Sequence, residues 1–308
     1  MKRAQLRAPA KLNLGLRVVA RRADGLHEIE SLFVPLALAD ELTIELGEPG
    51  IRLAVTGDAA GGVPADERNL AWRAAAEFMR EAGVEPGVTL ALVKNVPSPA
   101  GLGGGSSDAG AVLRGLAALL SGRVAPARLA ELALALGADV PFFLDPAPAL
   151  VEGIGERIQP IRGIPEFPVL LAHPGVGLAT KAVYAAFDAG ISLTAPKHVP
   201  KVRALLALRE ESGAAEARWL GSEDWLRALV INDLEPAATQ LCPLVAKLRE
   251  ELSETGAQAV GMSGSGPTMY AIYASEAAAQ EAQARIARTR ARTWLTRTQL
   301  AARQPQAT

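Results

Sequence analysis

Residues 97–107 read Pro-Ser-Pro-Ala-Gly-Leu-Gly-Gly-Gly-Ser-Ser, and the interpretation of the whole chain starts from this stretch. It joins an apolar run at residues 88–96, typical of a strand, to a run with helical periodicity that continues to about Leu120. Glycines let a backbone approach a ligand closely, and a loop that enters a helix directs free N–H groups and the positive end of the helix dipole at that ligand. The pattern therefore predicts a phosphate site.

The loop matches neither of the two commonest phosphate motifs. A Walker A loop needs a lysine after its last glycine, but no lysine lies between Gly101 and Asp108. A Rossmann fingerprint needs a glycine where Ser106 stands. Positive charge for a bound phosphate must therefore come from elsewhere in the chain. The alternative is a flexible surface turn in which Ser106, Ser107 and Asp108 only cap the helix.

Composition limits the classes of function. The chain has 308 residues, of which 49% are hydrophobic, which suits one large or two modest domains with a sizeable core. A net charge of −1 argues against a broad nucleic-acid surface. The single cysteine, Cys242, excludes an internal disulfide, and we expect it to be a buried spacer before Pro243. The three histidines do not form a zinc-type cluster in the sequence. No run is long and apolar enough for a membrane span, so we expect a soluble protein of the reducing cytoplasm.

Hydrophobic periodicity predicts a mixed α+β fold. Alternation over Leu6–Val18 indicates a strand with one buried face. A rise in proline and glycine content near residues 160–168 predicts a boundary between units at 1–163 and 164–308. In the first unit we expect further strands at 30–38, 43–46 and 88–96 and helices at 69–82 and 127–136. In the second we expect strands at 169–172, 269–273 and 293–300 and helices at 180–187, within 199–208, at 223–230, within 236–254 and at 276–289.

A second glycine-rich segment, residues 261–267, reads Gly-Met-Ser-Gly-Ser-Gly-Pro and lies between two strand-like runs. Taken alone it predicts a hairpin loop. Together with residues 97–107 it indicates more, because two glycine-serine loops can close around a phosphate chain from opposite sides with backbone donors.

Lys11 and Asp139 are candidate catalytic residues. Lys11 lies on the polar face of the first predicted strand, and Asp139 is the only charged residue between Leu132 and Leu144. A carboxylate in so apolar a stretch is costly unless it is paired. Asp139 can hold or deprotonate a substrate hydroxyl, while Lys11 keeps that carboxylate ionised and offsets charge on a transferred phosphoryl group. The alternative is a purely structural ion pair or a helix-end cap.

Residues 9–15, 97–107 and 261–267 resemble, in order and position, the three signature motifs of the GHMP kinases. This superfamily includes galactokinase, homoserine kinase, mevalonate kinase and phosphomevalonate kinase. The resemblance spans nearly the whole chain. It implies an N-terminal domain like ribosomal protein S5 and a ferredoxin-like C-terminal domain, both α+β, with the active site in the cleft between them.

Three further segments, residues 22–27, 137–141 and 173–175, resemble one branch of the superfamily. Kinases of that branch phosphorylate the 2-hydroxyl of a cytidine-diphosphate-linked methylerythritol in the non-mevalonate route to isoprenoids. The resemblance thus implies a small-molecule substrate, with neither nucleic acid nor membrane as a partner. We also expect the protein to be a monomer or a weak homodimer.

By motif matching, the resemblance assigns roles to individual residues. Lys11 and Asp139 take the catalytic positions. Mg²⁺ is expected to arrive with ATP, because the sequence shows no acidic pair suited to an all-protein metal site. The hydroxyl of Ser106 or Ser107 can reach the metal or a phosphate. The implied ATP-binding residues are Pro97, Ser98, Pro99, Ala100, Gly101, Leu102, Gly103, Gly104, Gly105, Ser106, Ser107, Gly264, Ser265 and Gly266. The implied substrate-binding residues are Asn13, Leu26, His27, Thr180 and Tyr184.

The substrate side departs from the family at Leu26. Members of the branch have tyrosine immediately before the residue that matches His27, and that ring stacks on cytosine. Leucine gives up an aromatic contact worth roughly 1–3 kcal/mol for stacked bases. Tyr184 matches a second aromatic position. Alternatively, His27 is a solvated turn histidine after Asp24 and Gly25, and Tyr184 is a core residue beside Phe187.

Two other functions stay open at this point. Another small-molecule GHMP kinase, of the mevalonate or homoserine type, is the first, and the lysine of the first motif and residues 22–27 count against it. A non-catalytic nucleotide-binding regulator on the same fold is the second, and the presence of both Lys11 and Asp139 counts against that.

Overall fold

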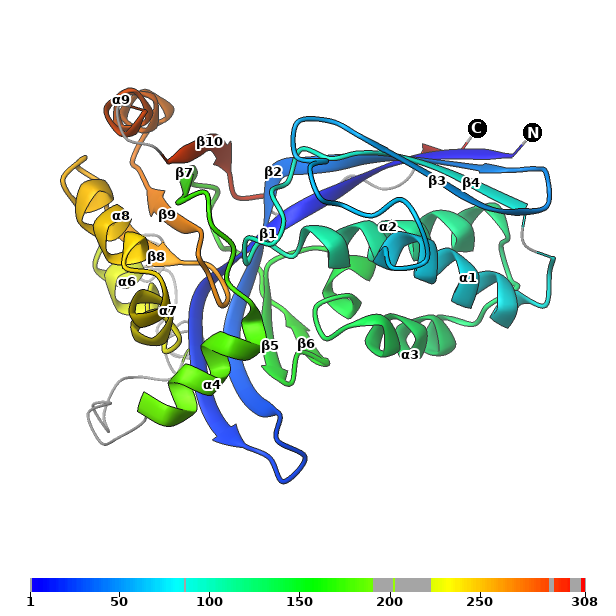
Figure 1. Ribbon diagram of the computed structural model, residues 1–308, viewed down its shortest axis with the longest axis horizontal. Coiled ribbons are helices and arrows are strands. Elements are labelled where there is room, and N and C mark those ends of the chain that lie inside the picture. Colours follow the sequence, from blue (N-terminus) through cyan, green and yellow to red (C-terminus); the bar gives the residue numbers. More distant parts are fainter. Residues whose placement is uncertain are drawn as a thin grey trace.

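A computed structural model of the chain describes residues 2–85, 87–190, 202, 223–287, 291–299 and 306–307. Figure 1 shows two lobes, each with a sheet and its own helices, joined by the long β1–β2 ribbon. The predicted α+β class is confirmed. Among the described residues, no helix is long and apolar enough to cross a membrane.

The larger sheet belongs to the first lobe. Its strands run in the order β11-β1-β2-β4-β3, and a β5–β6 hairpin extends it through β2. The pairs are antiparallel except β3 with β4. The bounds are β1 Arg3–Arg21, β2 His27–Leu46, β3 Gly50–Thr56, β4 Gly87–Val93, β5 Ala149–Gly153, β6 Arg157–Pro160 and β11 Gln306–Ala307.

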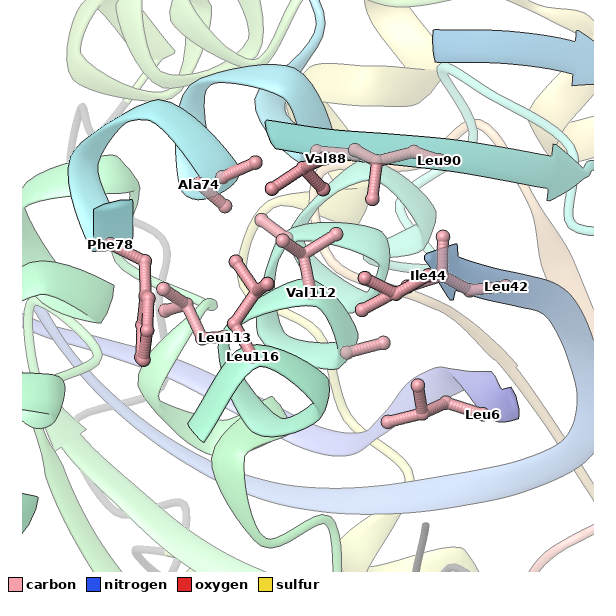
Figure 2. Packing of buried hydrophobic residues seen from close by; sticks show 14 of the residues in the cluster. Leu6, Leu42, Ile44, Ala74, Phe78, Val88, Leu90, Val112, Leu113 and Leu116 are labelled. Atoms are coloured by element: carbon pink, nitrogen blue, oxygen red, sulfur yellow. The ribbon is translucent and has the colours of Figure 1, made fainter. Parts of the chain in front are cut away.

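Helices α1 (Leu70–Ala82), α2 (Gly104–Leu119) and α3 (Pro126–Leu136) lie along one side of this sheet in Figure 1. Figure 2 shows their core, where side chains of α1, α2 and β4 meet those of β1 and β2. Phe78, Val112, Leu113 and Leu90 belong to this core, and all are fully buried. Each buried side chain of this size stabilises the folded state by about 1.5–3 kcal/mol. Helix α2, which begins at the glycine loop, is therefore firmly held.

The smaller sheet has the order β10-β7-β9-β8, with its paired strands antiparallel. Its helices gather at the far left of Figure 1, while α4 lies beside the tip of the β1–β2 ribbon. The strand bounds are β7 Pro168–His173, β8 Ala259–Met262, β9 Met269–Ile272 and β10 Arg292–Arg297. The helix bounds are α4 Thr180–Gly190, α6 Glu223–Leu229, α7 Glu235–Leu241, α8 Leu244–Ser253 and α9 Glu276–Ile286.

The prediction of one buried face for the first strand is wrong for its middle. From Ala8 to Leu16 every residue of β1 is buried, so the side chains on the predicted polar face of the strand are covered as well. Part of this cover comes from the second lobe, where a Cβ on Gly15 would lie 2.5 Å from the Leu229 carbonyl oxygen, and part from the first lobe, where Lys11 lies 4.6 Å from the centre of the Phe33 ring. The alternation identified the strand, but it carried no sign of a second layer that only tertiary folding supplies.

Other predictions differ from the structure in detail. Residues 30–38 and 43–46 belong to one continuous strand, β2, and the hairpin of β5 and β6, the strand β3 and the 3₁₀ turn η1 (Pro141–Leu144) were not predicted. Helix α2 begins at Gly104, so the last four residues of the glycine loop form its first turn. Cys242 is buried, as predicted. The helix expected within residues 199–208 lies, apart from Val202, outside the described residues.

Candidate active site

The three glycine- and lysine-bearing segments of the sequence meet in space. The backbone N–H of Lys11 donates to the Leu102 carbonyl oxygen at 2.9 Å, which attaches β1 to the first glycine loop. The Ser263 hydroxyl donates to the Gly101 carbonyl oxygen at 2.9 Å and lies 3.4 Å from the backbone nitrogen of Asn13. Segments separated by as much as 250 residues thus form one backbone framework.

Two glycines of the first loop are required by close contacts. Gly101 has φ +74°, and a Cβ there would lie 2.2 Å from the Ser263 carbonyl oxygen. Gly103 has φ +70°, and a Cβ there would press on the Phe143 ring and the Lys11 side chain. Any larger residue would combine left-handed backbone strain with a collision, so these positions fix how closely the loop approaches its neighbours.

The first turn of α2 has the features of an anion site. The residue before it, Gly103, provides no side-chain cap, so the first N–H groups of the helix are left to a ligand. Ser107 lies in this turn, and its hydroxyl is fully buried with no hydrogen-bond partner among the described residues. A buried hydroxyl without a partner is costly, and a phosphate or metal ligand would satisfy it.

Asn232 holds the second glycine loop, residues 261–267, through two hydrogen bonds to its backbone. Its side-chain amide donates to the carbonyl oxygens of Met262 and Gly264, both at 2.8 Å. The Thr180 and Ser265 hydroxyls lie 2.9 Å apart, which joins the start of α4 to the loop. The loop is therefore a fixed turn between β8 and β9, and the hairpin that the sequence predicted is confirmed.

Lys11 and Asp139 lie together as a pair. The Lys11 Nζ is 3.5 Å from Asp139 Oδ2, and the lysine side chain is only 4% exposed whereas that of Asp139 is 32% exposed. Lys11 Nζ also donates to Asn13 Oδ1 at 2.5 Å and lies 4.6 Å from the centre of the Phe33 ring. The ammonium is thus enclosed by the protein, while the carboxylate keeps an open side toward solvent.

Asn13 orients the lysine. Its side-chain oxygen accepts from Lys11, and its amide nitrogen donates to the Ser31 hydroxyl at 2.9 Å, which donates in turn to the Gly15 carbonyl oxygen at 2.5 Å. Asn13 is almost fully buried, so both halves of its amide are used within the protein. The structure places this predicted substrate-binding residue against Lys11.

His27 and Tyr184 form a second cluster at the ribbon tip. Their rings stack with centres 4.7 Å apart, and His27 Nε2 lies 2.7 Å from Asp188 Oδ1. Burial, with a smaller effect of the Asp139 charge, raises the pKa of Tyr184 to about 12, so the phenol is neutral and lies within the field of Asp139. Leu26, next to His27, has 48% of its surface exposed.

Two residues of this region escaped the sequence interpretation. Asp188 pairs with His27 across 161 residues, and nothing in its own sequence neighbourhood marks it. Lys94 lies under the first turn of α2, where a Cβ on Gly104 would be 3.5 Å from its Nζ. No lysine follows Gly101 within the loop, but Lys94 precedes the loop, directly after the end of β4.

Comparison with protein-family models gives two matches. The model described as "GHMP kinases N terminal domain" matches residues 69–145, and the one described as "GHMP kinases C terminal" matches residues 220–291. The chain is also similar to the 4-diphosphocytidyl-2-C-methyl-D-erythritol kinase of Citrifermentans bemidjiense. The two are 40% identical over 291 residues, which is 94% of this chain and 96% of the relative.

Solved structures agree with these matches. A crystal structure of 4-(cytidine 5'-diphospho)-2C-methyl-D-erythritol kinase superposes with a TM-score of 0.75 at 36% identity, covering 96% of this chain and 98% of the other. The homoserine kinase of Cytophaga hutchinsonii gives a TM-score of 0.70 at 19% identity, covering 99% and 97%. That second likeness shows the shared fold alone.

Proposed function

This chain belongs to the 4-diphosphocytidyl-2-C-methyl-D-erythritol kinases of the GHMP superfamily, and from that premise we propose that it transfers the γ-phosphoryl group of ATP to the 2-hydroxyl of 4-diphosphocytidyl-2-C-methyl-D-erythritol. The observation that carries the proposal is the Lys11–Asp139 pair, 3.5 Å apart beside a glycine loop that opens into a helix. Phosphoryl transfer asks mainly for positioning and charge stabilisation, and these residues provide both. The products are ADP and the 2-phosphate.

In the proposed reaction, Asp139 accepts the proton of the 2-hydroxyl as that oxygen attacks the γ-phosphorus. The bond from phosphorus to the β,γ-bridging oxygen then breaks, and ADP leaves. Lys11 lies 3.5 Å from Asp139 and offers its charge to the phosphoryl oxygens. Because Asn13 accepts from Lys11 on its other side, the ammonium is held in place before the substrates bind.

The ATP phosphates are proposed to lie against the first glycine loop and the first turn of α2, with the Gly264–Gly266 turn facing them. Mg²⁺ bound to ATP would neutralise phosphate charge, and the Ser107 hydroxyl fits it as an oxygen ligand because it is buried without a partner among the described residues. In the same part of the chain, no group of three or more His, Cys, Asp and Glu side chains forms a metal site of its own. The metal is therefore expected to arrive with the nucleotide.

The cytosine end of the substrate is proposed to lie at the ribbon tip, against His27 and Tyr184. The 2.7 Å contact with Asp188 suits a tautomer of His27 with its ring proton on Nε2, because a carboxylate oxygen accepts hydrogen bonds. Nδ1 is then an acceptor that suits an exocyclic amino group such as that of cytosine. Tyr184 presents its ring next to His27, and Leu26 covers the base without aromatic stacking.

The test is turnover of ATP by the purified protein with 4-diphosphocytidyl-2-C-methyl-D-erythritol, mevalonate or homoserine as the acceptor. We expect kcat/KM to be highest for the first by several orders of magnitude. Robust activity on mevalonate or homoserine instead would overturn the assignment in favour of another GHMP kinase. Tight nucleotide binding without turnover of any acceptor would favour the non-catalytic regulator. Light scattering on the same preparation tests the proposed oligomeric state, which is a monomer or a weak homodimer.

A further inference from the structure

A buried cluster of three charged side chains lies behind the glycine loop, and the proposed reaction does not use it. Lys94, 2% exposed at its side chain, forms ion pairs with Asp40 and Asp108, the second at 2.7 Å. Both carboxylates are buried to at least the same degree. Removing a charge from water costs several kcal/mol per ion unless the ion is well paired. Burial of three charged side chains in one cluster therefore needs a structural or functional explanation.

Asp40 holds the beginning of the loop. Its Oδ1 accepts the backbone N–H groups of Asn95 at 2.5 Å and Val96 at 2.8 Å, the two residues immediately before Pro97. Its Oδ2 accepts from Lys94. The carboxylate therefore fixes the backbone where the chain leaves β4 and turns into the loop.

Asp108 holds the end of the loop. It follows Ser107 in the first turns of α2, and its Oδ2 accepts from the same Lys94 ammonium at 2.7 Å. Lys94 Nζ lies directly beneath this turn, 3.5 Å from the position of a Cβ on Gly104. One ammonium is thus bonded to a carboxylate at each end of residues 97–107.

Electrostatics favours a charged lysine at this place. Burial on its own lowers the pKa of Lys94, but the Asp108 and Asp40 carboxylates outweigh that effect and raise it. Burial raises the pKa of Asp108 well above its ordinary range, against the opposing pull of Lys94. Oδ2 of Asp108 accepts from Lys94 whether or not the other oxygen carries a proton, so the link between the two loop ends persists in both states.

We propose that Lys94 is a positioning residue which, through Asp40 and Asp108, holds the two ends of the glycine loop at the separation that ATP phosphates require. The proposal rests on the proposed ATP site and assigns to Lys94 a role in nucleotide affinity rather than in the chemical step. A loop whose ends are fixed in advance loses less conformational entropy when the phosphates bind.

The direct test compares Asp108→Leu with Asp108→Asn. Leucine removes the acceptor at the α2 end and leaves Lys94 paired with Asp40, so no net charge is buried. Asparagine keeps a side-chain oxygen for Lys94. Calorimetric titration with Mg²⁺ and a non-hydrolysable ATP analogue should give a Kd raised about tenfold for Asp108→Leu, equivalent to about 1.4 kcal/mol. The Kd of Asp108→Asn should stay within about twofold of wild type. Equal Kd values for both variants and wild type would overturn the proposal.

A second pair of variants separates positioning from stability. Asp40→Asn/Lys94→Met/Asp108→Leu removes the whole charged cluster without leaving an unpaired buried charge, and the asparagine oxygen still accepts from Asn95 and Val96. Arg249→Met/Glu235→Gln removes a partly exposed charged pair in the other lobe, 2.6 Å between Nη2 and Oε2, and serves as the control away from the loop. Both should lower Tm, but only the first should raise the Kd for the analogue. An unchanged Kd in the first, or a raised Kd in both, would contradict the proposal.

The readout is binding of the nucleotide analogue, so it is independent of the acceptor. If wild type binds the analogue but turns over none of the three acceptors, the proposed function fails while the Lys94 comparison stands. If wild type turns over the methylerythritol substrate and the Asp108 variants bind alike, the Lys94 proposal fails while the function stands.

Discussion

The phosphate end and the base end of the candidate site are built differently. Around the glycine loops, backbone groups of separate segments bond to one another, and the side chains that support them, such as Lys94, are fully buried. At the ribbon tip the contacts are between side chains: His27 with Tyr184 and Asp188, beside an exposed Leu26. A phosphate presents the same oxygens in every substrate, so a backbone framework suffices; a base differs in its edge and needs particular side chains.

The largest effect is expected at the point where the two ends meet. Asp139→Asn removes the proton acceptor and should lower kcat by about 10²- to 10⁴-fold, with the Kd of an ATP analogue unchanged. Lys11→Ala should lower kcat by orders of magnitude as well. Steady-state assays with the methylerythritol substrate measure both. Near-normal turnover in either variant would reduce that residue to the structural ion pair that the sequence alone also allowed.

The next effect breaks the backbone framework itself. Gly101→Ala adds a Cβ 2.2 Å from the Ser263 carbonyl oxygen at φ +74° and should weaken binding of an ATP analogue by about tenfold or more. Gly256→Ala is the control, because its φ is +79° but nothing lies within 4 Å of its Cβ. Both variants bear a left-handed strain of roughly 1–2 kcal/mol in thermal unfolding. A similar loss of nucleotide binding in both would mean that the contact between the loops is unimportant.

A smaller effect is expected from the side-chain cluster at the base end. Asp188→Asn weakens the hold on the His27 ring and should raise KM for the methylerythritol substrate about fivefold, or about 1 kcal/mol, while KM for ATP stays unchanged. Glu223→Gln, which removes the acidic partner of an exposed pair on α6, serves as the control. A change in KM for ATP of the same size would show that Asp188 acts on the whole lobe rather than on His27.

The smallest effect restores the ring that the sequence lacks. Leu26→Tyr should lower KM for the methylerythritol substrate about threefold, below the roughly 1–3 kcal/mol of a fully stacked base, since Leu26 is 48% exposed. Val19→Tyr adds the same ring at another exposed position of the ribbon and should change nothing. If KM is the same in Leu26→Tyr as in wild type, the pocket compensates for the leucine by other contacts.

The same contrast explains what the sequence predicted well. Residues 97–107 and 261–267 were identifiable because glycine is required at fixed positions, such as Gly101, where backbones cross and φ is positive. The strand of Lys11 and the helix exit at Asp139 followed from local periodicity and end signals. Local signals are strong wherever backbone geometry alone decides the residue type, and the α+β fold followed from them.

What the sequence missed depends on tertiary contacts. Lys94 lies near the end of the predicted strand at 88–96, as many solvated lysines do, and only the folded chain brings Asp40 and Asp108 to it. The second face of β1 is buried by residues far along the chain, as in the contact between Gly15 and Leu229. Pairs of this kind leave no periodic pattern in the chain, so they required the structure.

The most direct measurement of the central claim is phosphorus NMR of a complete reaction of wild-type protein with ATP, Mg²⁺ and 4-diphosphocytidyl-2-C-methyl-D-erythritol. If Lys11 and Asp139 direct the 2-hydroxyl at the γ-phosphorus, one new phosphomonoester at carbon 2 should appear in equal amount with ADP. A phosphoryl group on another hydroxyl, or inorganic phosphate as the main product, would contradict it, because Asp139 would then be activating a different nucleophile.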